Sequence, residues 1–249
     1  MVTANDIIQT MYAMKNEQQS IHLMRFFKTA KGQYGEGDRF LGIKVPLTRA
    51  VVREAKCQVP LSEVEKLLYS EWHEIRLCGF LILVDEMKAV LPAAKRASNP
   101  LRRCEIKDFY LRHVRQANNW DLVDLSCPGI LGAWLLCIDG DGQLPQRQVL
   151  DYLAVSKNLW EQRIAIVSTL ALIRANQYAD TFRIATLLLA NQHDLIHKAV
   201  GWMLREVGKR DMNALRTYLT AHVHELPRTS LRYAIERMDT IERRAWMQL

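Results

Sequence analysis

The chain of 249 residues lacks any apolar run that approaches the roughly 20 residues needed to cross a bilayer. Its first residues also lack the basic-then-apolar pattern of a secretory signal. We therefore expect a cytoplasmic protein with no membrane partner. The five cysteines are odd in number, lie mostly within apolar runs and include no Cys-x-x-Cys pair. This pattern predicts buried free thiols and excludes a disulfide framework or a zinc site.

Patterns for metal, nucleotide and covalent chemistry are also missing. The seven histidines include no His-Glu-x-x-His, so we expect no metal. A glycine-rich segment contains Gly32, Gly35 and Gly37, but Asp38 and Arg39 follow where a phosphate-binding loop has Lys-Ser/Thr. No serine or cysteine lies in a recognisable nucleophile turn. The sequence therefore predicts no cofactor and no covalent intermediate.

Positive charge is in excess. Thirty-four Lys and Arg against 27 Asp and Glu give a formal net charge of +7. Such a balance favours an anionic partner without identifying it. Hydrophobic residues make up 49% of the chain, which is enough for a substantial core.

Apolar residues recur at steps of three and four along almost every patterned segment, as in 64–68 and 164–172. Alternating strand patterns flanked by hairpin turns are absent, so we expect an all-α protein. Polar or glycine-rich breaks fall at 30–46, 98–100, 139–142, 192–194 and just before Pro227. None is long enough for an interdomain linker, and we predict a single domain over residues 1–249.

Four predicted helix starts resemble one another and carry a basic residue in their first turns. They are 71–76 (EWHEIR), 158–163 (NLWEQR), 194–198 (DLIHK) and 227–232 (PRTSLR). Arg163, Lys198 and Arg232 are 35 and 34 residues apart, with Arg76 further upstream. This period is typical of stacked helical pairs, whose concave face would present one basic side chain per repeat to a phosphate backbone. An ordinary solvated helix face explains the spacing equally well.

Residues 118–126 (NNWDLVDLS) break this pattern, because Val123 or Asp124 fills the basic position. Trp120 and Asp124 are four residues apart and share a helix face. A carboxylate is a poor choice in a groove that binds phosphates, and a cationic reaction centre would explain it. The alternative is a surface acid, or an ion-pair partner for an arginine of a neighbouring repeat.

Hydrolysis of an alkylated purine nucleotide has such a centre. A purine alkylated at N3 or N7 already carries positive charge and leaves without a general acid. One carboxylate can stabilise the oxocarbenium-like sugar and place the water. Flanking indole rings add cation–π attraction of about 0.5–2 kcal/mol each.

A second tryptophan lies outside the apolar stripe of its predicted helix, 194–209. The stripe consists of Ile196, Val200, Met203, Leu204 and Val207. Trp202 instead shares a face with Lys198, Arg205 and Lys209. We therefore expect Trp202 on the groove side, whereas Trp134 and Trp160 fit apolar faces.

Several ordered segments resemble the AlkD family of DNA alkylation-repair glycosylases. They are 39–46 (RFLGIKVP), 119–124 (NWDLVD), 159–163 (LWEQR), 199–206 (AVGWMLRE) and 227–234 (PRTSLRYA). The likeness runs from about residue 20 to residue 238. It implies a HEAT-like repeat solenoid whose concave face holds duplex DNA.

The resemblance also implies site residues. Asp124 corresponds to the family's catalytic carboxylate, Trp120 and Trp202 to its sugar-contacting tryptophans, and Arg163 to its groove arginine. Tyr34 corresponds to a tyrosine that supports the DNA backbone. The family acts without a metal and is thought to work on a stacked lesion, unlike enzymes that flip their target base.

We therefore expect a monomeric, monofunctional glycosylase that hydrolyses the N-glycosidic bond of 3-methyladenine- and 7-methylguanine-type nucleotides in duplex DNA and leaves an abasic site. The expected DNA-binding residues are Arg163, Lys198, Arg205, Lys209, Arg228, Arg232 and Tyr34. The alternative is a non-catalytic HEAT-repeat scaffold that binds protein or DNA structures. The two hypotheses predict different effects of removing Asp124. A glycosylase would lose activity, whereas a non-catalytic protein would bind DNA as well as before or more tightly, because an acid is lost from a phosphate-binding groove.

Overall fold

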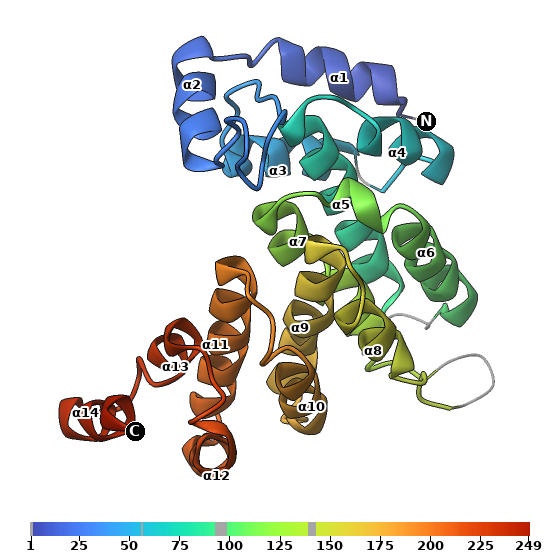
Figure 1. Cartoon of the computed structure of the whole chain (residues 1–249). Helices are drawn as coiled ribbons and strands as arrows, with labels where there is room; N and C mark the ends of the chain where they lie inside the picture. The colour runs from blue at the N-terminus through green and yellow to red at the C-terminus, as the bar shows by residue number, and fades with distance from the viewer. Residues whose placement is uncertain (1, 56, 93–98, 139–142) are drawn as a thin grey trace. The chain divides into compact units, whose positions relative to one another are not determined.

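The computed structural model describes residues 2–55, 57–92, 99–138 and 143–249. These residues form α-helices and contain no β-strand, only one isolated bridge between Arg39 and Trp72 (Figure 1). The helices are α1 (Ala4–Tyr12), α2 (Glu17–Phe26), α3 (Val45–Ala55), α4 (Leu61–Leu68), α5 (His73–Val90), α6 (Pro100–Arg112), α7 (Trp120–Ser126), α8 (Gln148–Ala154), α9 (Leu159–Arg174), α10 (Ala179–Leu187), α11 (Asp194–Gly208), α12 (Met212–His222), α13 (Arg228–Ala234) and α14 (Thr240–Gln248). The prediction of an all-α, helical repeat fold is confirmed.

The chain divides into two compact units, Met1–Ser126 and Cys127–Leu249. Each unit has its own buried apolar side chains. The single domain expected for residues 1–249 stays a prediction.

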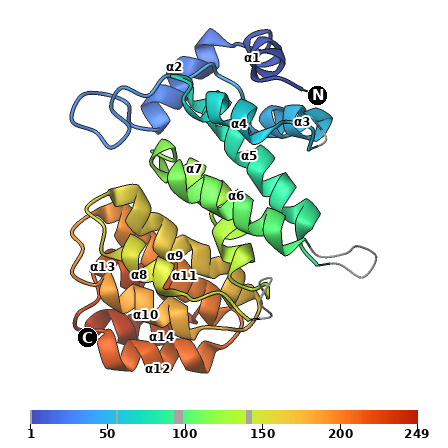
Figure 2. The same cartoon turned by 90° about the vertical axis from the view of Figure 1, so that its right-hand side faces the viewer.

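Helix α5 is the centre of the first unit. It packs against α3 and α4 on one side and against α6 and α7 on the other (Figure 2). Every residue from His73 to Leu83 is buried, because residues 77–83 are apolar around the whole helix and neighbouring helices cover it. A 3₁₀ turn, Val114–Gln116, precedes α7, which packs on α5. The short helix α7 is thus held against the most buried element of its unit.

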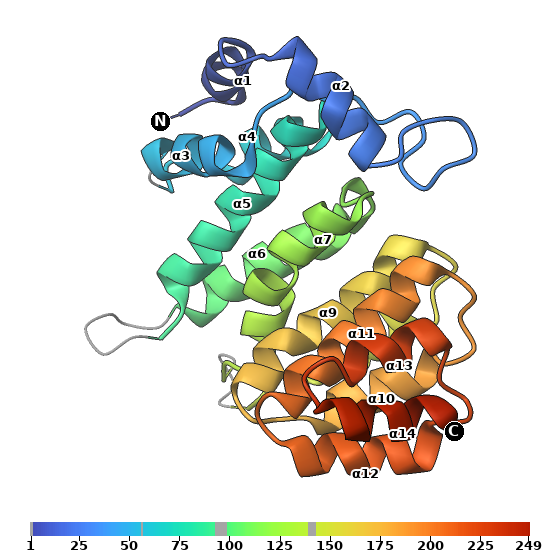
Figure 3. The same cartoon turned by 90° about the vertical axis from the view of Figure 1, so that its left-hand side faces the viewer.

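The second unit consists of stacked helical pairs. Helices α9, α11 and α13 pack side by side in sequence order (Figure 3). Helices α8 and α10 pack against α9, and α12 packs against α11. A side chain at Gly201 of α11 would lie 2.5 Å from the carbonyl oxygen of Ser230 and from the Cβ of Tyr233. The close approach of α11 and α13 therefore requires glycine at this position.

Side-chain caps and prolines fix the predicted helix starts. Asn158 accepts hydrogen bonds from the first turn of α9, and His193 does so for α11. Asn99 caps α6 in front of Pro100. Helix α13 follows Pro227. Of the predicted breaks, residue 98 and residues 139–142 lie outside the described residues.

The cysteines are all free thiols, as predicted. Three of them, Cys78, Cys127 and Cys137, are buried, but Cys57 is exposed and Cys104 is half-buried. The expectation of burial is therefore wrong for these two: Cys57 follows the end of α3, and Cys104 lies on a partly exposed face of α6. Among the described residues, no helix is both long and apolar enough to cross a membrane.

Candidate active site

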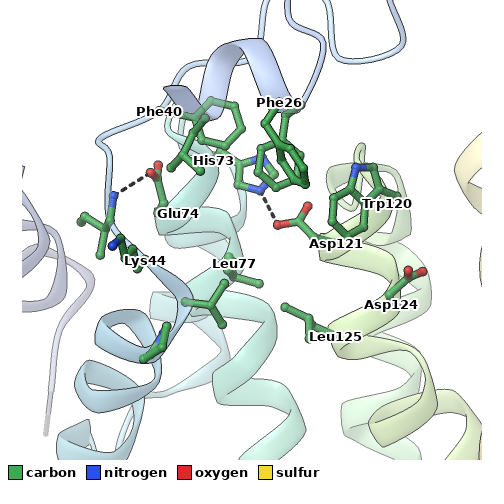
Figure 4. Close-up of a pocket in the computed structure, with 15 residues that line it drawn as sticks. Phe26, Phe40, Lys44, His73, Glu74, Leu77, Trp120, Asp121, Asp124 and Leu125 are labelled. Atoms are coloured by element: carbon green, nitrogen blue, oxygen red, sulfur yellow. Dashed lines mark hydrogen bonds and ion pairs between the residues drawn. The ribbon is translucent and has the colours of Figure 1, made fainter. Parts of the chain in front are cut away.

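Helix α7 presents Trp120 and Asp124 on one side, as the four-residue spacing predicts (Figure 4). Both side chains are half-buried, whereas Leu122 and Val123 face the core and are fully buried. Asp121, three residues before Asp124, is buried and points toward His73 of α5. One turn of α7 thus directs one carboxylate into the protein and leaves the other partly open to solvent.

Trp120 and Asp124 lie at a pocket of about 380 Å³ in the first unit. Its lining is dominated by aliphatic and aromatic side chains, and Phe26, at the end of α2, is 56% exposed beside Trp120. The residues that line it are Leu23, Phe26, Phe27, Phe40, Ile43, Lys44, Val45, Pro46, His73, Glu74, Leu77, Trp120, Asp121, Asp124 and Leu125. An apolar pocket lowers the local dielectric, which strengthens any attraction between Asp124 and a cation.

A column of stacked rings holds Trp120 in place. The Trp120 indole stacks on Phe27 at 5.1 Å between ring centroids, Phe27 stacks on Phe40 at 5.0 Å, and Phe40 stacks on the His73 imidazole at 4.3 Å. Phe26 meets the indole edge-on at 5.8 Å. Offset or edge-on aromatic pairs contribute about 0.5–1.5 kcal/mol each beyond burial, so the orientation of the indole is fixed before any ligand binds.

A buried ionic network ties α7 to the rest of the unit. The His73 imidazole bridges two carboxylates: Nδ1 lies 2.8 Å from Oδ2 of Asp38, and Nε2 lies 2.9 Å from Oδ2 of Asp121. Arg76 donates to the other oxygen of Asp38 at 2.5 Å and to the carbonyl of Ser70 at 2.9 Å. Two buried carboxylates and two buried cations therefore balance in charge, as burial requires.

The protonation of His73 follows from its neighbours. Burial alone lowers the pKa of His73, but the facing carboxylates of Asp121 and Asp38 outweigh it and raise the pKa to about 9. Burial alone would raise the pKa of Asp38, yet the hydrogen bonds and charges of His73 and Arg76 leave it lowered. At neutral pH the bridge is an imidazolium between two carboxylates.

Glu74, the next residue of α5, holds the loop that leads into α3. Its carboxylate accepts backbone N–H bonds from Leu41 at 2.8 Å, Gly42 at 2.8 Å and Ile43 at 3.0 Å. Figure 4 shows Glu74 with one of these bonds as a dashed line. Gly42 has φ +88°, and a Cβ there would collide with the carbonyl oxygen of Asn16. The first turn of α5 therefore positions both α7 and the loop on the opposite side of the pocket.

The sequence interpretation missed this network of Asp38, His73, Arg76 and Asp121, and it also missed the hydrogen bonds of Glu74 to the loop. A signal was available, because the start of the segment 73–83 carries three ionisable side chains in a run that is otherwise apolar. Charges in a fully buried helix need partners elsewhere in the chain. The partners of His73 lie 35 and 48 residues away, so spacing along one helix did not reveal them.

In the second unit, Trp202 lies outside the apolar stripe of α11, as predicted, while its place on a DNA-binding face stays a prediction. The apolar stripe of α11 is buried, while Trp202 is half-buried and its Nε1 donates to Glu206 at 3.2 Å. Arg205 pairs with Glu236, and Lys209 pairs with Glu206 at 2.5 Å. Trp134 and Trp160 are buried, as expected of apolar faces.

The predicted array of exposed basic side chains is wrong at two positions. Arg76 is buried in its ion pair with Asp38. Arg163 is 5% exposed, and its guanidinium donates to the carbonyl of Leu195 at 2.6 Å. These arginines satisfy acceptors inside the protein, and Arg163 links α9 to the first turn of α11. A contact of Arg163 with DNA stays a prediction.

The remaining predicted DNA-binding residues are more accessible. Lys198 is half-buried and pairs with Asp194 at 2.8 Å. Arg228 and Arg232 are exposed, and Arg228 donates to the carbonyl of Met247. Tyr34 is half-buried in the loop between α2 and α3. The roles of these residues stay predictions.

Comparison with known proteins decides the family. The sequence model of the DNA alkylation repair enzyme family matches residues 7–238. The chain belongs to this family. This DNA alkylation repair protein is also similar to the solved structure of a protein from Enterococcus faecalis that is described as a predicted DNA alkylation repair enzyme. The TM-score is 0.67 at 16% identity, over 91% of this chain and 97% of that one.

At that identity the similar structure shows a shared fold. No similar sequence was found among curated proteins. Family membership confirms the resemblance predicted from the ordered segments. It gives this DNA alkylation repair protein an enzymatic role in DNA repair.

Proposed function

We propose that the protein is a monofunctional glycosylase that removes cationic alkylated purines of the 3-methyladenine and 7-methylguanine type from duplex DNA. The observation that carries the proposal is the pairing of Trp120 and Asp124 on one side of α7, at the mouth of an apolar pocket, in a chain of this family. A half-buried carboxylate beside a fixed indole suits a cation and is unsuited to a phosphate.

In the proposed reaction the bond between C1′ of the sugar and the purine nitrogen breaks, and the electron pair leaves with the base. The positive charge of the alkylated base is thereby neutralised, so no general acid is needed. Positive charge develops on the sugar, where Asp124 stabilises it electrostatically. Water adds to C1′ and loses a proton, which leaves an abasic site. Asp124 also orients this water.

The indoles and basic side chains bind the rest of the substrate. Trp120 contributes cation–π attraction to the reacting nucleotide, and Trp202 of the second unit contacts the sugar–phosphate backbone. Lys198, Arg205, Lys209, Arg228 and Arg232 neutralise phosphates. The ion pairs of Lys198, Arg205 and Lys209 with nearby acids exchange for pairs with phosphate.

The proposal is tested by the release of free 7-methylguanine from methylated duplex DNA. The wild-type protein is expected to release the base, and Asp124→Asn is expected to lose on the order of 10²-fold or more in rate, as when one electrostatic stabiliser is removed from an enzyme. Asp108→Asn is the matched control, because this aspartate is an exposed residue of α6 that pairs with the adjacent Lys107. Its rate should equal that of the wild type.

A second substrate tests the absence of a general acid. Duplex DNA containing deoxyuridine has a neutral leaving base, which should not be released. Failure of the folded, DNA-binding wild-type protein to release either methylated purine would refute the glycosylase and favour the non-catalytic scaffold.

A further inference from the structure

A hollow between α13 and α14 concentrates positive charge at the C-terminal end of the second unit. It has a volume of about 320 Å³ and is lined by Arg232, Ile235, Thr240, Arg243, Arg244 and Met247. The three arginines come from two helices and are all exposed. Three arginines and a threonine thus line one space that is open to solvent.

The carboxylates near this hollow interact with groups other than the arginines that line it. Glu242 accepts two hydrogen bonds from Arg216 at 2.7 and 2.9 Å, and Glu236 pairs with Arg205. Asp239 caps the first turn of α14. Among the residues that the structure describes, no carboxylate lies within ion-pair distance of the guanidinium groups that line the hollow.

Core packing does not account for helix α14. It has no buried residue, and Ile241 is 82% exposed. The helix is held by the pair between Arg216 and Glu242 and by the Arg228 guanidinium, which donates to the carbonyl of Met247. The match to the family ends at residue 238, before α14 begins. Polar contacts therefore anchor the helix, and its arginines line the hollow.

We propose that Arg232, Arg243 and Arg244 form a binding site for backbone phosphates of duplex DNA, which extends the DNA contact surface beyond the residues matched by the family. Guanidinium groups bind phosphate oxygens through paired N–H donors, and arginines on two helices can hold one phosphate from two directions. The Thr240 hydroxyl adds a neutral donor. This inference rests on the proposed function for its choice of ligand, because a repair glycosylase must hold undamaged duplex while it searches.

The test is the affinity of the full chain for an undamaged fluorescent duplex at a series of salt concentrations. The double variant Arg243→Gln/Arg244→Gln should bind more weakly. Its slope of log affinity against log salt should be less steep by about 0.9 for each phosphate that the variant no longer neutralises. Arg243→Lys/Arg244→Lys keeps both charges and should retain most of the slope. Because α14 contributes nothing to the core, circular dichroism of each variant should be unchanged.

A matched control removes the same charge elsewhere. Arg49 and Arg53 are exposed arginines four residues apart on α3, in the other unit. The variant Arg49→Gln/Arg53→Gln should leave the slope at its wild-type value. An equal change in both double variants would mean that net charge alone is responsible, and it would overturn the site. No change in the α14 variant would also overturn it.

The two proposals fail in different ways. If the wild-type protein binds duplex with a salt slope that depends on Arg243 and Arg244 but releases no base, the phosphate site stands and the glycosylase is wrong. If the α14 variant binds as the wild type does while base release continues, the site is wrong and the glycosylase stands.

Discussion

At the scale of single residues, His73 determines how firmly the proposed catalytic helix is held. Its charged ring is the link between α5 and α7, through Asp121, and between α5 and the loop before α3, through Asp38. The groups that face it are these two carboxylates, with Arg76 on the far side of Asp38 and Asp124 and Lys44 along the same pocket. We therefore expect the free energy of unfolding to depend on whether the His73 imidazole is protonated.

The free energy of unfolding should fall as pH rises from about 6.5 to about 9. The pKa of His73 is raised from 6.5 to about 9, so the folded protein keeps a proton that the unfolded chain releases. The stabilisation is complete below 6.5 and is lost above 9. A shift of this size corresponds to roughly 3 kcal/mol. Urea unfolding at several pH values measures it, and a flat profile between pH 6.5 and 9.5 would contradict the charged bridge.

His73→Gln provides the control for this pH dependence. The neutral side chain removes the titrating group, so the decline between pH 6.5 and 9 should disappear, while two carboxylates are left without a cation. Removing one partner of a buried pair costs about 3–5 kcal/mol. If His73→Gln does not fold, Asp121→Asn provides a second control and should still fold. It removes one of the two anions that keep the His73 imidazole protonated, so the unfolding free energy should fall less between pH 6.5 and 9.

Substitution of Trp120 or Trp202 should lower the rate of base release more than it lowers the affinity for duplex DNA. Trp120→Phe and Trp202→Phe keep an aromatic ring but lose the stronger cation–π attraction of the indole. We expect a several-fold lower rate of base release at saturating methylated DNA and little change in binding of undamaged duplex. Single-turnover rates and fluorescence anisotropy separate the two effects. Equal losses in rate and affinity would mean that the substitutions disturb folding instead.

At the scale of helices, the sequence predicts some features well and others not at all. The stripe of α11, the start of α9 and the shared face of Trp120 and Asp124 are confirmed, because each depends on residues within one helix. The buried state of Arg163 depends instead on a carbonyl of the next helix. Helical spacing places a residue on a face, but the facing element decides whether that face meets solvent.

The loop before α3 gives an element-scale prediction. Glu74 satisfies the N–H groups of three consecutive residues, and Gln can present only one carbonyl oxygen to them. Glu74→Gln should therefore lower the free energy of unfolding by about 1–3 kcal/mol for each buried N–H left unsatisfied. Glu54→Gln, on the exposed side of α3, is the matched control and should unfold as the wild type does in urea. Similar unfolding midpoints for both variants would show that the hydrogen bonds between Glu74 and this loop add no stability.

At the scale of the whole molecule, both units share the excess of positive charge. The formal charge of +7 is spread over both of them, and many of the basic side chains are already paired with acids. Exposed pairs of this kind contribute about 0–1 kcal/mol, so exchange of an acid for a phosphate costs little. Net charge and local pairing together therefore favour duplex DNA as a partner that both units can bind.

The salt dependence of the wild-type protein tests this partner independently of catalysis. Each neutralised phosphate contributes about −0.9 to the slope of log affinity against log salt, so contacts to six phosphates give a slope near −5. We expect such a slope for undamaged duplex, measured by fluorescence anisotropy at constant pH. Asp124→Asn should bind at least as tightly as the wild type, because it removes a negative charge beside the DNA. A nearly flat response to salt would exclude a phosphate-binding surface on this scale, whatever the protein does to a damaged base.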